Sequence, residues 1–184
     1  MPLPIAHSLI GASIVAASYP NKTPRENWKS LFVGAALATA PDLDFVVVWV
    51  FNLNRDWHRG FTHSLFFAVL VGLLIYVFKG RQFLKEAILF GLVVLSHGLF
   101  DALVSIKGGV GLLWPFSHRF AFGLFEYPDT LELSYYPGSD ALIIKGLYGV
   151  LVCSLYEFIF CGSFFLLILG MNRILRDRRA AQRT

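Results

Sequence analysis

The stretch His58-Arg-Gly-Phe-Thr-His63-Ser64 immediately precedes an apolar run that extends from Leu65 to Phe78. Imidazole is the commonest protein ligand for zinc and related metals, and two histidines here flank one glycine. Positions five apart on a helix point about 140° away from each other. Gly60 lets the chain leave a helix, and Thr62 is placed to cap the helix that follows. The stretch therefore predicts a turn that directs one or both imidazoles inward, followed by a membrane helix; the alternative is a histidine-rich loop at a membrane surface.

The composition is that of a membrane protein. The 184 residues are 56% hydrophobic and 15% charged, with a mean hydropathy of +0.61, whereas about a quarter of a soluble domain is charged. We expect one integral membrane domain over residues 1–184. The net charge of +4 comes from basic residues spread over several loops, so no nucleic-acid partner is expected. Cys153 and Cys161 match no zinc motif, and no charged region precedes the first apolar stretch, so no secretory signal is expected.

Five apolar segments are separated by polar or irregular stretches. They cover residues 4–19, 30–51, 65–78, 87–106 and 141–170. Pro41 interrupts the second segment, and the last is long enough to span a bilayer with tilt. The expected fold is all-α: a polytopic helical membrane protein with about five apolar helices around a buried polar or metal site.

The basic residues are divided unequally between the two sets of alternate loops. Eleven lie in the stretches 20–29, 79–86 and 171–184, and five lie in the opposite set. The positive-inside rule places the richer set in the cytoplasm. We therefore expect a bacterial plasma (inner) membrane protein whose amino terminus is outside and whose basic tail, residues 171–184, is cytoplasmic.

Ionisable residues from four segments fall into one layer of the bilayer. At about 1.5 Å per helical residue they lie roughly 17 to 24 Å above the cytoplasmic loops; they are His7, Asp42, His63, His97 and Asp101. A charge in this layer costs at least a few kcal/mol on insertion scales, so five at one level favour a shared metal. For each residue alone, the alternative is an interhelical hydrogen bond or a helix cap.

Spacing adds detail to the metal hypothesis. His97 and Asp101 are four apart and share a helix face, and histidine with carboxylate suits zinc, manganese or iron. Asp42 and Asp44 would splay on a regular helix. After Pro41, either both point inward on an irregular turn that lines a polar cavity, or Asp44 caps the helix beginning at the next residue. Deep in the last segment lies Glu157, either a hydrogen-bonding packing residue or a site residue.

The motifs also resemble a known family. His7, Ala-Pro-Asp42-Leu-Asp44, His58-Arg-Gly-Phe-Thr-His63-Ser, Ser96-His97-Gly-Leu-Phe-Asp101 and the string from Gly108 through Trp114-Pro115 to Phe120 occur in this order. Over roughly residues 1–140 the chain resembles the YdjM-like family of predicted membrane-bound metal-dependent hydrolases. That family is in turn similar to the zinc-dependent phospholipase C and single-strand nuclease superfamily, which is all-helical and holds a metal cluster.

The resemblance implies metal ligands here. By the order of ligands in the superfamily they are His7, Asp42, His63, His97 and Asp101, with His58 a further candidate. The soluble enzymes also use an amino-terminal tryptophan and a later histidine with a carboxylate four residues on, and this chain has neither. We therefore expect one or two divalent ions rather than three, with zinc the first choice and manganese the second.

The implied chemistry is hydrolysis of a phosphoester by metal-activated water, on a lipid or lipid-linked substrate. The catalytic candidates are Asp44, Arg59 and Arg119. Either arginine could hold phosphate in a bidentate fork, or both could be interfacial residues that meet lipid headgroups. Trp114-Pro115-Phe116 is expected to lie in the interface as a lid or a lipid entry.

Two other classes of function remain open. An ion-coupled transporter would use the broken helix with paired carboxylates, but the sequence has no inverted repeat. A non-catalytic protein would use a closed four-ligand metal site to hold its helices together, whereas an open coordination position favours catalysis. No His-Glu-x-x-His motif is present, which argues against a metalloprotease of that type.

Overall fold

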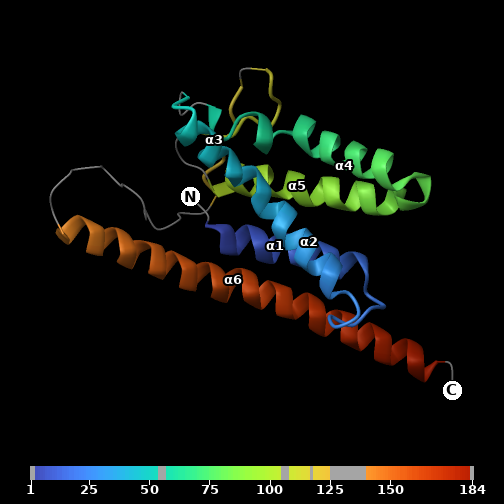
Figure 1. The fold of residues 1–184 in the computed structure, drawn as a ribbon. Helices are drawn as coiled ribbons and strands as arrows, with labels where there is room; N and C mark the ends of the chain where they lie inside the picture. The colour runs from blue at the N-terminus through green and yellow to red at the C-terminus, as the bar shows by residue number, and fades with distance from the viewer. Residues whose placement is uncertain (1–2, 54–56, 105–107, 117, 125–139, 183–184) are drawn as a thin grey trace.

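The computed structural model describes residues 3–53, 57–104, 108–116, 118–124 and 140–182, with the backbone alone for residues 140–147. Its helices are α1 (Pro4–Ser18), α2 (Trp28–Thr39), α3 (Asp44–Val50), α4 (Leu65–Lys79), α5 (Leu84–Val104) and α6 (Asp140–Ala181), with the 3-10 turns η1 (Ala40–Leu43), η3 (Phe61–His63) and η4 (Arg81–Phe83) (Figure 1). Among these residues the β-structure is one isolated bridge, between Val110 and Phe120. The expected all-α fold is confirmed.

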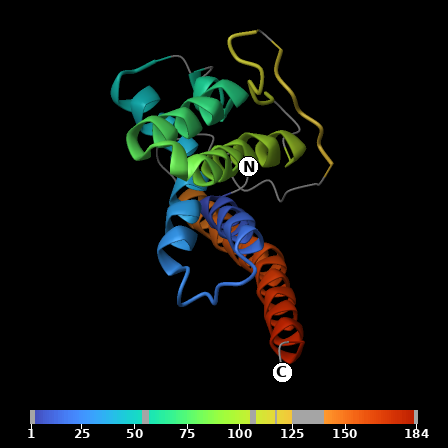
Figure 2. The same ribbon diagram turned by 90° about the vertical axis from the view of Figure 1, so that its right-hand side faces the viewer.

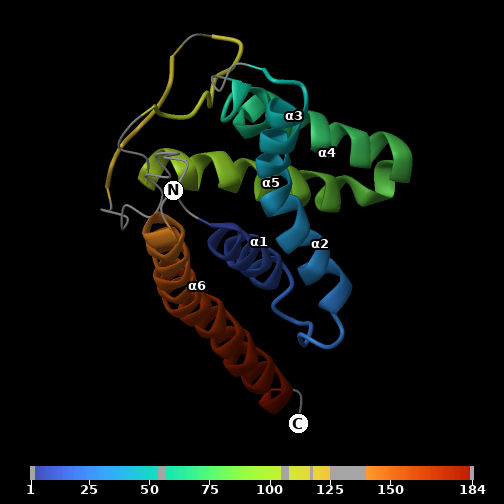
Figure 3. The same cartoon turned by 60° about the vertical axis from the view of Figure 1, so that its left-hand side comes forward.

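Helix α1 lies at the centre of the bundle. It packs against α6 on one side and against α2 and α5 on the other, and α4 and α5 form an antiparallel hairpin (Figures 1 and 3). Small residues allow these close approaches. A Cβ added at Gly11 of α1 would lie 2.5 Å from the Gly34 carbonyl oxygen of α2, and one added at Gly72 of α4 would lie 3.0 Å from the Ala87 carbonyl oxygen of α5.

Three helical stretches in the described part of the chain are long and apolar enough to cross a membrane. They are Trp28–Val50, Arg81–Val104 and Tyr148–Ala181. The first contains η1, a 3-10 turn that interrupts the regular helix at Pro41, as the sequence predicts. Helices α1 and α4 are apolar but have 15 residues each, which gives about 22 Å at 1.5 Å per residue. The protein is thus a helical membrane protein in which two of the five apolar segments are short.

Two helix boundaries differ from the sequence prediction. The N-cap of α4 is Ser64, whose hydroxyl accepts the Phe67 N–H at 3.1 Å; the prediction that Thr62 caps this helix is wrong, because its hydroxyl bonds Asp44 instead. Helix α6 does not end where the apolar run ends but continues through the basic tail to Ala181, in keeping with the good helix propensity of arginine and leucine.

Candidate metal centre

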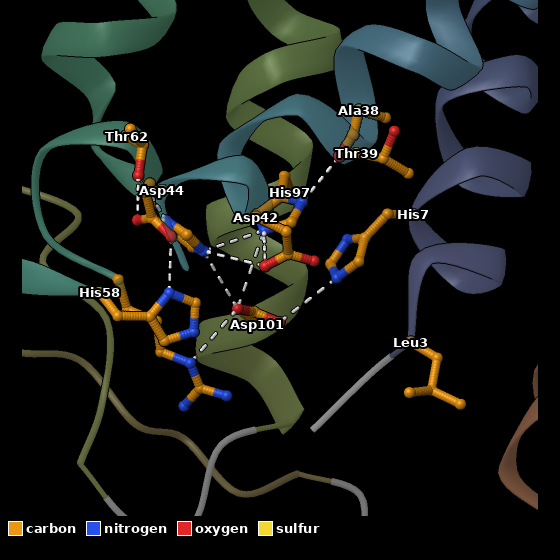
Figure 4. A network of polar contacts seen from close by, with 12 residues as sticks. Leu3, His7, Ala38, Thr39, Asp42, Asp44, His58, Thr62, His97 and Asp101 are labelled. Carbon is orange, nitrogen blue, oxygen red and sulfur yellow. Dashed lines mark hydrogen bonds and ion pairs between the residues drawn. The ribbon is translucent and has the colours of Figure 1, made fainter. Parts of the chain in front are cut away.

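Four side chains from three elements lie close together, and three of them, Asp42, His97 and Asp101, are labelled in Figure 4. They are Asp42 of η1, His63 of η3, and His97 and Asp101 of α5, and each offers a ligand atom within 4.8 Å of the others. The two histidines and Asp101 are fully buried, whereas the Asp42 side chain is 20% exposed. The arrangement brings together residues that are separated by up to 59 positions in the chain.

The separations between these atoms are those of a coordination polyhedron. The Nε2 atoms of His63 and His97 are 3.0 Å apart. Asp42 Oδ1 lies 3.6 Å from the first nitrogen and 3.4 Å from the second, and Asp101 Oδ2 lies 3.6 Å and 3.9 Å from them. Two zinc ligands at about 2.0–2.1 Å from the ion in tetrahedral geometry lie roughly 3.4 Å apart. The four side chains therefore fit a single divalent ion.

The hydrogen bonds around the four also favour a cation. His97 Nδ1 is 2.6 Å from the Ala38 carbonyl oxygen; a carbonyl can only accept, so Nδ1 carries the proton and Nε2 presents its lone pair to the centre. Asp42 Oδ1 and both oxygens of Asp101 are buried and have no hydrogen-bond partner in the part of the chain that the structure describes. Buried carboxylate oxygens without donors are costly, and a bound cation would remove that cost.

His7 of α1 lies beside the group of four. Its ring stacks on that of His97, with centroids 3.8 Å apart and planes at 22°. Its Nε2 lies 3.4 Å from Asp101 Oδ1, whereas His63 and His97 contact Asp101 through Oδ2. Asp101 therefore stands between His7 and the four-ligand position.

His58 and Asp44 form a pair at the edge of the centre. His58 Nδ1 is 2.6 Å from Asp44 Oδ1, and the Thr62 hydroxyl donates to Asp44 Oδ2 at 2.5 Å. The alternative in which Asp44 caps the following helix is wrong, because α3 begins at Asp44 itself. The carboxylate oxygens of Asp44 contact His58 and Thr62 instead. His58, expected as a further metal ligand, lies outside the group of four, with its ring centroid 5.5 Å from that of His63.

The two candidate arginines lie in different places. Arg59 adopts a left-handed backbone conformation with a φ of 63°, and its Nε lies 3.7 Å from Asp101 Oδ2, so it borders the centre directly. Arg119 lies on the loop 108–124, where Nη1 reaches the carbonyl oxygens of Gly108 and Gly109 at 3.4 and 3.5 Å. Arg59 is thus the arginine that the fold brings to the metal centre, and Arg119 braces the loop.

The aromatic loop is fastened to the elements that carry the ligands. The Gly111 N–H donates to the Arg59 carbonyl at 2.8 Å, and the Leu65 N–H donates to the Leu112 carbonyl at 2.9 Å. At the end of α5 the Phe122 N–H donates to the Ala102 carbonyl at 2.8 Å, which satisfies a carbonyl that the helix end leaves without a partner. The loop therefore fixes the 59–65 turn against the last turn of α5.

Sequence reasoning missed one residue on which the geometry depends. Gly98 follows His97 on α5, and a Cβ there would lie 2.1 Å from the His63 carbonyl oxygen. Only a glycine lets η3 come this close to α5, and this approach brings His63 and His97 together. The available signal was a glycine inside a helix that carries two ligand candidates, where a glycine is otherwise unfavourable.

Comparison with known proteins relates the chain to inner membrane proteins. Over 132 residues the chain is 37% identical to the inner membrane protein YbcI of Escherichia coli (strain K12), a match that covers 65% of this chain and 75% of that protein. No solved structure matches the chain. Together with the three helices able to span a bilayer in the described residues, the similarity assigns the protein to the inner membrane. Residues 1–173 match the family described as YdjM inner membrane protein, so the chain belongs to the YdjM family.

Proposed function

We propose that this protein is a membrane-embedded, metal-dependent hydrolase that cleaves a phosphoester of a lipid or lipid-linked substrate. The observation that carries the proposal is the convergence of four ligand atoms beside an arginine and an Asp–His pair. A zinc or manganese ion held by Asp42, His63, His97 and Asp101 would supply an activated water and neutralise developing charge on the phosphate.

The remaining residues have roles that follow from their positions. Arg59 borders the centre through Asp101, and its guanidinium matches two phosphate oxygens in a fork. His58 is oriented through Nδ1 by Asp44, which leaves Nε2 to hold or deliver a proton at the substrate. Thr62 fixes the second oxygen of Asp44 and so keeps the pair in place.

A lipid-borne substrate is favoured by where the centre lies. Its ligands come from Trp28–Val50 and Arg81–Val104, two of the stretches that can span a bilayer, and from the turn before α4. Around them, large apolar side chains such as Phe45, Trp49 and Phe66 are more than half exposed, as is expected of surfaces that meet lipid. A water-soluble substrate would have to enter this apolar surrounding, whereas a lipid is already there.

The test is metal analysis of the protein purified in detergent, followed by assays with lipid phosphoesters and with water-soluble phosphodiesters. We expect one or two bound ions per chain, and faster hydrolysis of the lipid substrates. The variants His97→Ala and Asp101→Ala should lose metal and activity together, and Ser96→Ala, which removes a hydroxyl from the neighbouring position of α5, should keep both. Hydrolysis that persists in both ligand variants would contradict the proposal.

A second candidate rests on burial. His63, His97 and Asp101 have side chains that are 0% exposed, and a closed four-ligand site is typical of a structural zinc. In that case the ion would tie η1, η3 and α5 together without catalysis. Full metal content, a large loss of thermal stability on chelation and no hydrolysis of any phosphoester would favour this structural role over the hydrolase.

A further inference from the structure

Helix α6 carries two buried polar side chains that face α1. Glu157 is 1% exposed and Asn172 is 6% exposed. The Glu157 carboxylate accepts the backbone N–H of Leu3 and, at 3.0 Å, that of Ala6. Fifteen positions further along, Asn172 Nδ2 donates to the Ala16 carbonyl oxygen at 2.8 Å. Helix α6 lies alongside α1 (Figure 3), and its side chains thus bond backbone groups at both ends of that helix.

The chemistry at each end matches the polarity of α1. The first amides of a helix lack intrahelical partners and carry partial positive charge, which a carboxylate satisfies; at the last turn the orphan carbonyls need a donor, which the asparagine amide supplies. The N-cap position Leu3 has no side-chain oxygen to offer. Because α1 is about 22 Å long and the hydrocarbon core about 30 Å thick, its ends cannot both rely on water.

The Glu157 contact lies directly beside a residue of the metal centre. Ala6, whose N–H it accepts, precedes His7. Both ring nitrogens of His7 are buried and have no hydrogen-bond partner within the described ranges. The ring is therefore held by stacking on His97, by the 3.4 Å contact of Nε2 with Asp101 and by the placement of its helix. A rotation or axial shift of the first turn of α1 would move His7 away from Asp101.

We propose that Glu157 is a positioning residue that holds His7 at the metal centre. The inference rests on the proposed function of that centre and extends it to the last helix. Both Glu157 and Asn172 make a buried hydrogen bond between the same two helices. Only Glu157 is expected to position His7, because Asn172 bonds the opposite end of α1, nine residues from His7.

The experiment is a Co²⁺ titration of the purified full-length protein, followed by visible absorption. We expect Glu157→Ala to weaken Co²⁺ binding about tenfold to a hundredfold, and we expect the same of His7→Ala. The double variant should bind Co²⁺ no more weakly than His7→Ala alone. Asn172→Ala is the matched control and should bind Co²⁺ like the unmodified protein. Glu157→Gln, which keeps one acceptor oxygen, should show the same non-additivity at smaller amplitude and carries the test if the alanine variant aggregates.

Two results would overturn the inference. The first is an additive loss in the double variant, and the second is an equal loss in Asn172→Ala; either would make Glu157 a general packing contact. Absence of Co²⁺ binding by the unmodified protein would remove the centre and the inference together. Coupled Co²⁺ binding without any phosphoester hydrolysis would leave the positioning role in place and contradict only the proposed activity, because the titration does not depend on turnover.

Discussion

Asp42 and Asp44 are two residues apart in the chain yet belong to different parts of the site. Asp42 ends close to both histidine Nε2 atoms, while Asp44 contacts His58 and Thr62. Under the proposed function the first carboxylate would bind the ion, and the second would orient the His58 side chain beside it. Both residues lie where η1 passes into α3, and the tighter winding of a 3-10 turn changes the angle between their side chains from that of a regular α-helix.

Substitution by asparagine should separate these roles. Asp42→Asn is expected to lose most of the bound metal, because a neutral amide is a much weaker ligand for a divalent cation. Asp44→Asn should keep the metal and lower turnover by about 10² to 10⁴, the range that a correctly held acid or base contributes. Parallel metal titrations and rate measurements on the two variants check this. Equal loss of metal in both would show that Asp44 also binds the ion.

At this scale the sequence was informative about which residues meet and less so about how. Depth along the apolar segments predicts that His7, Asp42, His63, His97 and Asp101 share a layer, and the structure does bring them into contact. The pairing of His58 with Asp44 could not be predicted, because it is a tertiary contact between residues 14 positions apart, which no local pattern encodes.

At the scale of the elements, the close contact between η3 and α5 constrains where His63 lies. The His63 carbonyl approaches α5 at Gly98, and the aromatic loop bonds the backbone at both ends of the same turn, through Gly111 and Leu112. The turn is therefore in contact with both a helix and a loop.

Gly98→Ala should consequently displace η3. The added methyl would lie 2.1 Å from the His63 carbonyl oxygen, so we expect a loss of about 1–3 kcal/mol in stability, as for other overpacked sites, and weaker metal binding. Gly162→Ala in α6 is the control, since its Cβ would meet nothing within 4 Å and alanine favours the helix by roughly 0.5–1 kcal/mol. Thermal unfolding in detergent and a Zn²⁺ titration measure both effects. An unchanged Zn²⁺ affinity in Gly98→Ala would show that the close approach does not determine the centre.

The presence of the helices could be predicted from the sequence, but the residues at which α4 begins and α6 ends could not. The five apolar segments all form helices because the length and hydropathy of each run leave the backbone no other way to satisfy its hydrogen bonds in lipid. The cap of α4 was misassigned by two residues, since Thr62 and Ser64 are chemically equivalent as caps and only the tertiary contact with Asp44 distinguishes them. Similarly, α6 extends past its apolar run because its basic end binds backbone of the loop after α1, through Arg176.

For the whole molecule, the sequence predicts an orientation in the membrane. The basic residues divide eleven to five between alternate loops. On the richer side, Thr23 and Glu26 close a capping-box turn before α2, and the Thr23 N–H and hydroxyl hold the pKa of the Glu26 carboxyl below its usual range. This acidic side chain therefore stays charged among the basic ones and is suited to water rather than lipid.

Reporter fusions should place the two sides. A fusion after residue 184 is expected to report the cytoplasm and one after Phe116, in the aromatic loop, the opposite face, because the positive-inside rule acts on the loops next to the spans. A cytoplasmic reporter and a periplasmic reporter at each position give the control. The same side at both positions would contradict the topology and, with it, the layer argument for the metal ligands.

Helix α6 is long enough to serve as a fusion point for a rigid scaffold in particle imaging. Its 42 residues extend about 63 Å at 1.5 Å each, roughly twice the thickness of a hydrocarbon core of about 30 Å, and its carboxyl end projects beyond the other helices (Figures 1 and 2). Arg176 and Arg179 fasten that end to the loop after α1, so it is braced. A helical scaffold continued in register from Ala181 would inherit this direction, and would give particle images of a 20.6 kDa protein a landmark outside the detergent micelle.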